Sequence, residues 1–549
     1  MVNSLNNPIL KSICVGSTII TLALSPNINK DSLIIPKIAL LFLLALYLIP
    51  KLVVSLRKIL KVKELKTLFI IISLIIMQLL IVFFSSEAPL EQQLYGRTGR
   101  GMGILTQISM LVVMLATAVF IKKSDLKIIL LTLTTSALIS SAYSIFQSYG
   151  IDFIRWDTRT NGVIGTLGNP NFQSSFAALA LVPAFFVFWN TRYRYLFGIG
   201  SFVIFFWTIY KTQSTQGYVT SALAVCVFVV IFLWHKNRLM ASLAIIFSMT
   251  AGIVSVFGML NFGPLRDYLY KSSVQSRGDF WRSALVTANE HPITGVGIDS
   301  FGDYYLKYRD LVAVNHPFAE YADNAHNFFL EYAATGGYPL LVLHLILLIF
   351  VLLSFFSIQR KLGKFDLQLS LIFTVWVAFQ AQSVISPGNI ALILWNAVIS
   401  GALIGYNSAV GNSGEFNYIT QESQSFTRPF SVLLVVFGLI IYYPLFNTDR
   451  QQLIAMSRKD GDLAIISAQK FPESVLRYTI ITRELLDSQL PQQALVLARS
   501  AVEFNPNSPN LWALILINPV APTDERLLAK SKLLELDPLN REVIDYKVP

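Results

Sequence analysis

Six arginines occur in pairs within three polar segments that separate long apolar stretches of the chain. The segments are "YGRTGRGMG" (Arg97, Arg100), "IRWDTRTNGVIGTLGNPN" (Arg155, Arg159) and "SSVQSRGDFWRSAL" (Arg277, Arg282). A guanidinium group binds phosphate oxygens through two parallel hydrogen bonds, and several converging groups could hold a diphosphate without a metal ion. Any one such arginine is more often a surface residue, but six on one side of the protein would predict a diphosphate site.

Arg277 is the strongest of these cations on local grounds. Ser276 and Asp279 fit a capping box, which predicts a helix that begins there with Arg277 in its first turn. A helix N-terminus attracts anions through its free N–H groups and its dipole. An ion pair between Arg277 and Asp279 is the alternative.

His326 lies in "YADNAHNFFLEYAATGG", where Asp323 or Asn324 is expected to cap the helix that follows. A histidine at this place can titrate near neutral pH and take a proton from a hydroxyl group. It could equally be a structural histidine at a helix start. His316 lies in the same loop and is the next candidate base, whereas His291 precedes a proline and indicates a turn.

Long apolar segments must position these residues. Hydrophobic residues make up 54% of the chain and charged residues only 14%, which indicates a membrane protein that crosses the bilayer many times. Thirteen spans are expected, at 9–26, 33–56, 67–85, 104–121, 127–148, 171–189, 194–211, 217–234, 239–260, 337–357, 367–386, 389–408 and 429–446. The fold class is therefore all-α, a polytopic membrane protein with about 12–13 transmembrane helices.

Lysine and arginine are concentrated in the even-numbered connections between these spans, such as 57–66, 122–127 and 360–364. Positively charged loops stay in the cytoplasm, so the N-terminus is expected inside and the odd-numbered connections outside. The predicted location is the cytoplasmic (inner) membrane, with the large loop and the C-terminal tail extracytoplasmic. Loop charges of this kind set topology, so the basic net charge does not indicate a nucleic-acid partner.

Four regions are expected: an N-terminal transmembrane region (1–260), a large extracytoplasmic catalytic loop (261–336), a C-terminal transmembrane region (337–446) and an extracytoplasmic helical tail (447–549). In the tail, Phe471-Pro472, Asn505-Pro506 and Asp537-Pro538 close successive amphipathic segments at nearly the 34-residue period of tetratricopeptide arrays. Such a tail could dock a protein partner. A plain helical cap is the alternative.

Ionisable residues are rare in the middles of the expected spans, where His344 and Lys37 are the main examples. Lys37 is close enough to a span end to snorkel. An ion-coupled transporter would carry more such groups. The outward loops also lack a His and carboxylate set with ligand spacing, so no metal or other cofactor is expected.

Taken together, these segments resemble the O-antigen ligase and polymerase superfamily of bacterial glycan-assembly proteins. The resemblance rests on "SRGDFWRSALVTANEHPITGVGIDSF", "AHNFFLEYAATGG" and "GTLGNPNFQSSFAALAL". It implies a polyprenyl-diphosphate-linked glycan donor and transfer of the glycan outside the cytoplasmic membrane. By motif, Arg277 would bind the diphosphate and His326 would orient or deprotonate the acceptor. The other implied substrate-binding residues are Arg282, Arg97, Arg100, Arg159, Gln216, Asn169 and Asn327.

One motif departs from the family pattern. Many members have Ser-Arg-Gly after the seventh span, whereas this chain has Thr215-Gln216-Gly217, so a neutral amide replaces a cation. Either other arginines compensate or the diphosphate is held differently.

Two other classes of function stay open on sequence alone. One is a flippase or transporter for lipid-linked glycans, and the other is a membrane scaffold for glycan assembly. Within the favoured class, the sequence does not separate a polymerase, a lipid ligase and a protein O-glycosyltransferase, so the acceptor could be a glycan, a lipid or a protein.

Overall fold

The structure is a computed structural model that describes residues 7–152, 154, 156, 162–188, 192–316, 321–411, 421–458 and 460–548, with only the backbone of 411 and 421–426. The described residues form helices and no strands, which confirms the all-α fold class. The long helices are α1 (Pro8–Leu22), α2 (Ile34–Val54), α4 (Lys63–Ser85), α6 (Ile104–Phe120), α7 (Leu126–Ser148), α8 (Pro170–Val187), α9 (Arg194–Thr212), α10 (Thr215–Lys236), α11 (Arg238–Met259), α16 (Phe328–Leu362), α17 (Leu367–Ser383), α18 (Ile390–Gly411) and α19 (Gln421–Arg458).

Each of the thirteen expected spans coincides with one of these helices. Ten of them are long and apolar enough to cross a membrane, within the part of the chain that the structure describes. The exceptions are α1, α6 and α17, with 15, 17 and 17 residues. At 1.5 Å per residue these are shorter than the roughly 30 Å of a bilayer core, so they depend on neighbouring helices for cover.

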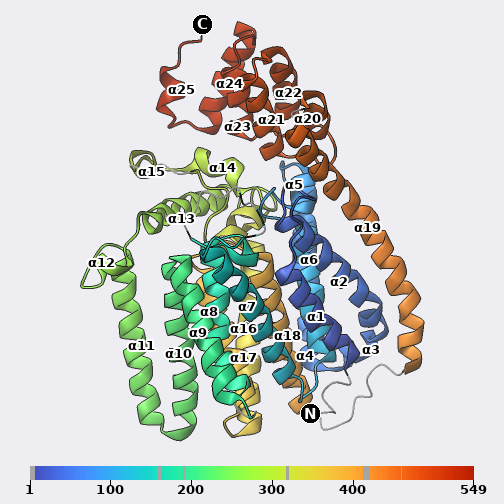
Figure 1. Cartoon of the computed structure of the whole chain (residues 1–549), viewed down its shortest axis with the longest axis vertical. Coiled ribbons are helices and arrows are strands. Elements are labelled where there is room, and N and C mark those ends of the chain that lie inside the picture. The colour runs from blue at the N-terminus through green and yellow to red at the C-terminus, as the bar shows by residue number, and fades with distance from the viewer. Residues whose placement is uncertain are drawn as a thin grey trace.

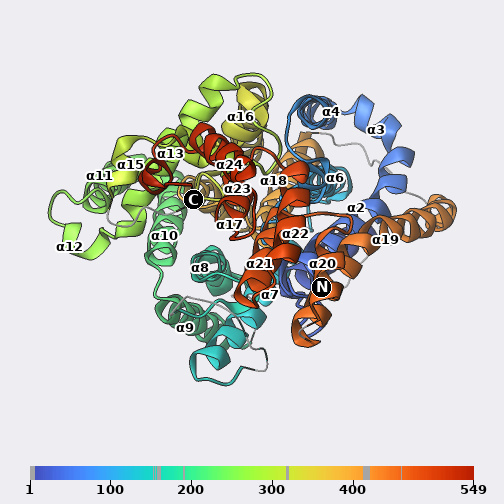
Figure 2. The same ribbon diagram turned by 90° about the horizontal axis from the view of Figure 1, so that it is seen from above.

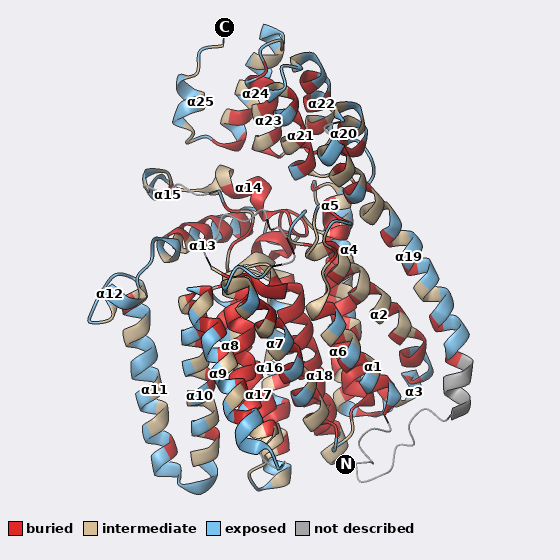
Figure 3. Cartoon of the chain, in the orientation of Figure 1, coloured by how far each residue is buried: buried red, intermediate tan, exposed pale blue. Residues whose placement is uncertain are grey.

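Helices α6 and α18 form the centre of the bundle. In α18, 94% of the apolar window is buried, whereas in α11 only 6% is buried. Gly401 and Gly405 lie one turn apart, and a Cβ at either would come within 2.3 Å of a carbonyl oxygen of α6. These glycines let the two backbones approach closely, as small residues do in membrane helix pairs. Figure 3 shows the buried centre and the exposed flanks of α11 and α19.

Lys37 does not snorkel, which corrects the expectation. Its side chain is 1% exposed, and Nζ donates hydrogen bonds to Thr21 O (3.2 Å) and Ala23 O (2.6 Å) at the end of α1. The last carbonyls of a helix lack partners within the helix, so a buried ammonium group there is well satisfied.

Shorter helices cluster at one end of the bundle. They include α5 (Leu90–Tyr95), η2 (Gly165–Leu167), α12 (Arg266–Leu269), α14 (Phe301–Tyr308) and α15 (Leu311–Asn315), and they lie with the longer but more polar α13 (Ser272–Glu290), while α3 (Leu56–Lys61) follows α2. Helices α12–α15 and the tail lie at the same end, and the N-terminus lies at the opposite end (Figure 1). Seen from above, the tail lies over the bundle (Figure 2).

The tail consists of α20 (Gly461–Ala468), α21 (Val475–Asp487), α22 (Pro491–Phe504), α23 (Pro509–Leu516), α24 (Thr523–Leu536) and α25 (Arg541–Asp545). Helices α22 and α24 each end directly before one of the predicted closing dipeptides, Asn505-Pro506 and Asp537-Pro538. The tail has its own apolar core, centred on residues such as Tyr478 and Leu497. The tetratricopeptide identity of these helices stays a prediction.

A kink divides α16 and sets the direction of its first segment. Gly337 has φ 73°, and Tyr338 N donates to Pro292 O (2.9 Å). The side chain of Gln78 in α4 donates to Ile293 O (2.7 Å) and Gly336 O (3.0 Å). The loop that carries Pro292 therefore packs into the kink, and the helix begins at Phe328, before the expected span of 337–357.

We expect Gly337→Ala to destabilise the protein more than Gly363→Ala, which changes the glycine after the same helix. Both residues have positive φ, but a Cβ at Gly337 would lie 2.3 Å from Ile293 O, whereas Gly363 has open space around it. Positive φ costs an L-residue about 1–2 kcal/mol, and overpacking adds about 1–3 kcal/mol. Thermal unfolding of the detergent-purified variants measures the difference. Equal melting temperatures for the two variants would show that the kink tolerates a side chain.

The loop and the tail are expected to face the same, extracytoplasmic compartment. In a chain without its two native cysteines, Val312→Cys and Leu527→Cys should react with an impermeant maleimide on intact or outer-permeabilised cells. Both positions are exposed, at 53% and 55%. Lys364→Cys, in an exposed connection at the other end, should react only after lysis. Protection of both outward positions in unlysed cells would overturn this topology.

Candidate functional site

A cavity of about 430 Å³ lies between the starts of α8 and α10, the helix α13 and the segment before α16. Four of the sequence-predicted residues line it: Arg277, His326, Gln216 and Asn169. Lys271 and Tyr321 line it as well, and no carboxylate is among its described lining residues. The cavity is therefore a cationic site.

Arg277 lies in the second turn of α13, because this helix begins at Ser272 rather than at Ser276. The predicted capping box is thus wrong. Ser276 Oγ donates to Ser272 O (3.4 Å) within the helix, since earlier residues already take up the helical conformation. Asp279 instead accepts hydrogen bonds from Arg282 (2.6 Å) and His316 (2.5 Å).

No described carboxylate pairs with Arg277, so the alternative ion pair with Asp279 is not formed. Burial lowers the pKa of the Arg277 guanidinium from its usual value. The group stays charged because arginine starts from a very high pKa. A partly buried cation with no described counter-ion is well suited to receive an anionic ligand.

His326 is held by the turn that precedes α16. Its backbone N–H donates to Asn324 Oδ1 (2.6 Å), and its φ is 49°. The cap of α16 is Asn327, whose side chain accepts from Phe329 N (3.0 Å). The expected caps Asp323 and Asn324 are therefore wrong, because Asp323 accepts from Arg100 and Asn324 accepts from His326 N. Asn327 has a structural place and does not line the cavity.

The imidazole of His326 packs on Phe280, with ring centroids 5.3 Å apart. None of the described residues hydrogen-bonds its ring nitrogens. Burial, followed by the nearby charge of Arg100, lowers the pKa of His326 to about 4; Arg277 adds to this and Asp323 opposes it. The ring is therefore neutral at pH 7 and can accept a proton or a hydrogen bond.

The other predicted arginines with described side chains are in ion pairs. Arg97 Nη1 lies 3.1 Å from Asp303, and Arg100 Nε donates to Asp323 (2.9 Å). Arg282 lies on the outer side of α13 and bridges Asp279 and Asp310, each at 2.6 Å. Arg97, Arg100 and Arg282 do not line the cationic cavity. Arg159, like Arg155, lies outside the described residues.

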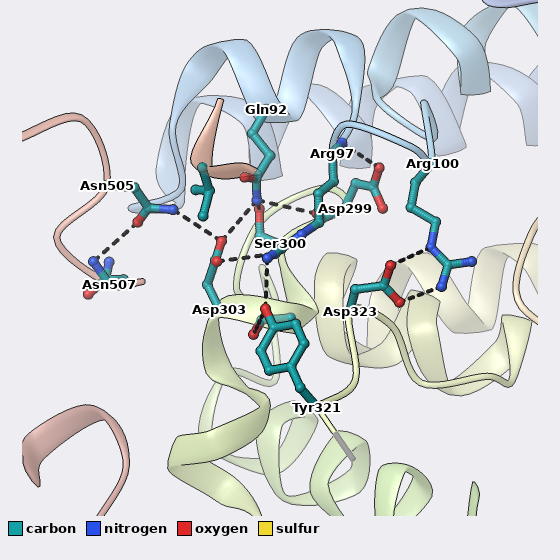
Figure 4. Close-up of polar contacts among 12 residues, drawn as sticks. Gln92, Arg97, Arg100, Asp299, Ser300, Asp303, Tyr321, Asp323, Asn505 and Asn507 are labelled. Atoms are coloured by element: carbon teal, nitrogen blue, oxygen red, sulfur yellow. Dashed lines mark hydrogen bonds and ion pairs between the residues drawn. The ribbon is translucent and has the colours of Figure 1, made fainter. Parts of the chain in front are cut away.

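The Arg97 pair is part of a buried network that reaches the cavity (Figure 4). Asp303 also accepts from Gln92 Nε2 (3.0 Å), and Arg97 Nη2 donates to the hydroxyl of Tyr321 (2.7 Å). Burial disfavours the Arg97 charge, but Asp303 and its neighbours outweigh burial and raise the Arg97 pKa. In the second pair, burial acts to raise the pKa of Asp323, but Arg100 lowers it to about 2. The members of both pairs are therefore charged. Through Tyr321 and Asp323 the two arginines hold the 321–326 segment in place.

Gln216 takes part in a polar contact between helices. Its Nε2 donates to Gln382 Oε1 (2.9 Å), while its own Oε1 is buried without a partner among the described residues. Asn169 caps α8 by accepting from Asn171 N (2.8 Å). Sequence reasoning missed Lys271 and Tyr321. Lys271 is the N-cap of α13, so a correct prediction of where this helix begins would have identified Lys271 as a candidate.

The described ranges contain no cluster of three or more His, Cys, Asp or Glu side chains that could hold a metal ion.

Two comparisons with known proteins gave a match. Residues 200–345 match the family model described as O-Antigen ligase, a segment that contains Gln216, Arg277 and His326. A protein of Haemophilus influenzae described as an uncharacterized protein is 24% identical over 264 residues, which cover 44% of this chain and 62% of that relative. The chain thus spans less than two thirds of the relative that it matches. The family match supports the resemblance to the O-antigen ligase superfamily and a glycan ligase or polymerase role at the membrane.

Proposed function

We propose that this protein is a glycosyltransferase that moves a glycan from a polyprenyl diphosphate to an acceptor outside the cytoplasmic membrane. The observation that carries the proposal is the cavity in which unpaired Arg277 and neutral His326 meet without a described carboxylate. A diphosphate ester needs cations around its oxygens, and an acceptor hydroxyl needs a base. The O-antigen ligase match over the same residues supports this assignment.

The leaving group sets the first requirement of the reaction. As the bond between the anomeric carbon and the phosphate oxygen breaks, the electron pair stays on the diphosphate and its negative charge grows. Arg277 would neutralise this charge with its fork of N–H donors, and Lys271 lies in the same cavity. The stabilisation is largest in the transition state, so it accelerates the step and does not only bind substrate.

The acceptor sets the second requirement. Its oxygen forms the new bond to the anomeric carbon, and its proton would pass to a ring nitrogen of His326. Because cations are part of the reason for the low pKa of His326, an anionic diphosphate beside Arg277 would raise that pKa. Donor binding would therefore make the histidine a better base.

The remaining arginines are proposed to support the site. Arg97 and Arg100 would hold the segment before α16, through Asp303 and Asp323, and Arg282 would fix α13. Gln216 and Asn169 would contact substrate with amide groups. Gln216, which replaces the arginine of many family members, carries no charge. In this proposal the positive charge at the diphosphate comes from Arg277 and Lys271, which line the same cavity.

We expect His326→Ala and Arg277→Ala to fail in different ways. His326→Ala should slow turnover by roughly 10²–10⁴-fold, as loss of a general base does, with donor binding near the wild-type value. Arg277→Ala should weaken donor binding and also slow turnover, and Arg277→Lys should recover only part of both because an ammonium cannot form the bidentate fork. Donor affinity and product formation from a purified polyprenyl-diphosphate glycan measure the two effects.

Matched controls are His235→Ala and Arg266→Ala, since His235 is exposed at the end of α10 and the Arg266 side chain is 60% exposed. Each variant must insert and purify like the wild type. A folded His326→Ala protein with full transfer activity would remove the histidine from the mechanism, and His316 would then be tested as the base.

We also expect turnover to be independent of divalent metal ions, because arginine supplies the charge that a metal would otherwise supply. Chelator should leave the rate of glycan transfer unchanged at saturating donor. Loss of activity with chelator, followed by recovery on addition of Mg²⁺ or Mn²⁺, would contradict this account of the diphosphate site.

A further inference from the structure

A second cavity, of about 420 Å³, lies beside the first and is closed on one side by the tail. Leu476, Arg477 and Ile480 of α21 form this wall. The other walls come from the starts of α2, α8 and α18. A hydrogen bond between Thr98 and Ser474 (2.7 Å) fastens the tail to the bundle next to the cavity. The tail therefore contributes one wall of the cavity, and the remaining lining residues come from other segments.

The two cavities share a lining residue. Asn169 lines both of them. Arg100 and Asp323, which hold the turn that carries His326, line the second cavity. An acceptor bound in the second cavity would therefore have its nucleophile near Asn169 and His326, on the side away from Lys271 and Arg277.

The charges of the two cavities differ. The described lining of the first contains the cations Lys271 and Arg277 and no carboxylate. The described lining of the second is balanced, with the cations Lys30, Arg100 and Arg477 and the carboxylates Asp31, Asp323 and Asp449. A diphosphate is favoured in the first cavity only. A neutral ligand with many hydroxyl groups can use both the donors and the acceptors of the second.

Arg477 is held in a fixed position in the wall that the tail contributes. Its side chain is 4% exposed, and Nη1 donates to the carbonyls of Ser467 (3.0 Å) and Pro472 (3.0 Å). Its Nε is buried and has no partner among the described residues. Beside it, Phe172 offers an apolar ring, which suits the apolar face of a sugar. The hydrogen bonds of Nη1 therefore hold the guanidinium in one position in the cavity wall.

We propose that the second cavity binds the terminal sugar of a saccharide acceptor, so that the tail forms part of the substrate site. This inference rests on the proposed glycosyltransferase function and assigns one acceptor class within it. The acceptor hydroxyl would reach His326 past Asn169, while the diphosphate of the donor occupies the cationic cavity. The new glycosidic bond then forms where the cavities adjoin.

The test uses the full-length protein in detergent and two probes: the intact polyprenyl-diphosphate oligosaccharide, and the same oligosaccharide released from its lipid and diphosphate. Ile480→Trp should fill the second cavity and weaken binding of the released oligosaccharide by about tenfold or more, with donor affinity unchanged. Arg277→Ala should have the opposite effect on the two probes. Ile466→Trp is the matched control, because Ile466 is 58% exposed on α20 of the same tail.

Leu476→Trp, at a more exposed part of the wall, replaces Ile480→Trp if that variant does not fold. Binding of the released oligosaccharide that is the same in wild type and in the folded wall variants would overturn the proposal. A loss of donor affinity in the wall variants would place the glycan of the donor in the second cavity and also overturn it. Unchanged donor affinity in Arg277→Ala would instead contradict the proposed function, so the two failures are distinguishable.

Discussion

The buried ion pair between Arg97 and Asp303 is the interaction on which the site depends most. It joins the connection before α6 to α14, and the same arginine reaches the hydroxyl of Tyr321 at the edge of the cavity. Asn505 of the tail donates to the same carboxylate (3.1 Å), so three regions of the chain meet at one buried charge. Removing one partner of a buried pair costs roughly 3–5 kcal/mol, because the other charge is left uncompensated. The network is therefore a strong constraint on where the segment before α16 can lie.

That constraint makes an asymmetric electrostatic site possible. Arg97 and Arg100 are paired with carboxylates, whereas Arg277 and Lys271 line the first cavity, which has no carboxylate among its described lining residues. Asp299 belongs to the same organisation. It accepts from Arg97 N (2.7 Å) and Met102 N (3.2 Å), which fixes the turn, and burial raises its pKa to about 6. The paired arginines hold the loop segments in place, and the cations without a described carboxylate partner are the ones proposed to bind substrate.

The kink of α16 links this frame to the membrane helices. The first segment of the helix carries the cap Asn327 directly after His326, and Gly337 redirects the chain into the long apolar segment. Gln78 of α4 donates to Gly336 O at the kink and to Ile293 O of the loop packed into it, which avoids the cost of unpaired carbonyls inside a helix bundle. The position of His326, the proposed base, thus depends on a glycine eleven residues later and on a glutamine from a distant helix.

Hydropathy alone predicted where every long helix of the described chain would form, because a stretch of about 20 apolar residues has few other stable states. The proline positions of the tail predicted where α22 and α24 end, since proline cannot continue a helix. Short-range polar signals were less informative. Ser276 with Asp279, and Asp323 with Asn324, can each cap a helix, but such residues act as caps only where a helix begins, and packing decides that.

Which arginines remain unpaired was decided by the tertiary structure. The carboxylates that pair with Arg97 and Arg100 lie 206 and 223 residues further along the chain, so no local pattern could reveal them. Residue type and local helix signals therefore identified Arg277 and His326 as candidates, but they also proposed Arg97, Arg100 and Arg282 for substrate binding, and these pair with carboxylates. Coulomb interactions act over a few ångströms in space, whatever the separation in sequence, and only the fold brings Arg277, His326 and Gln216 to one cavity without a described carboxylate.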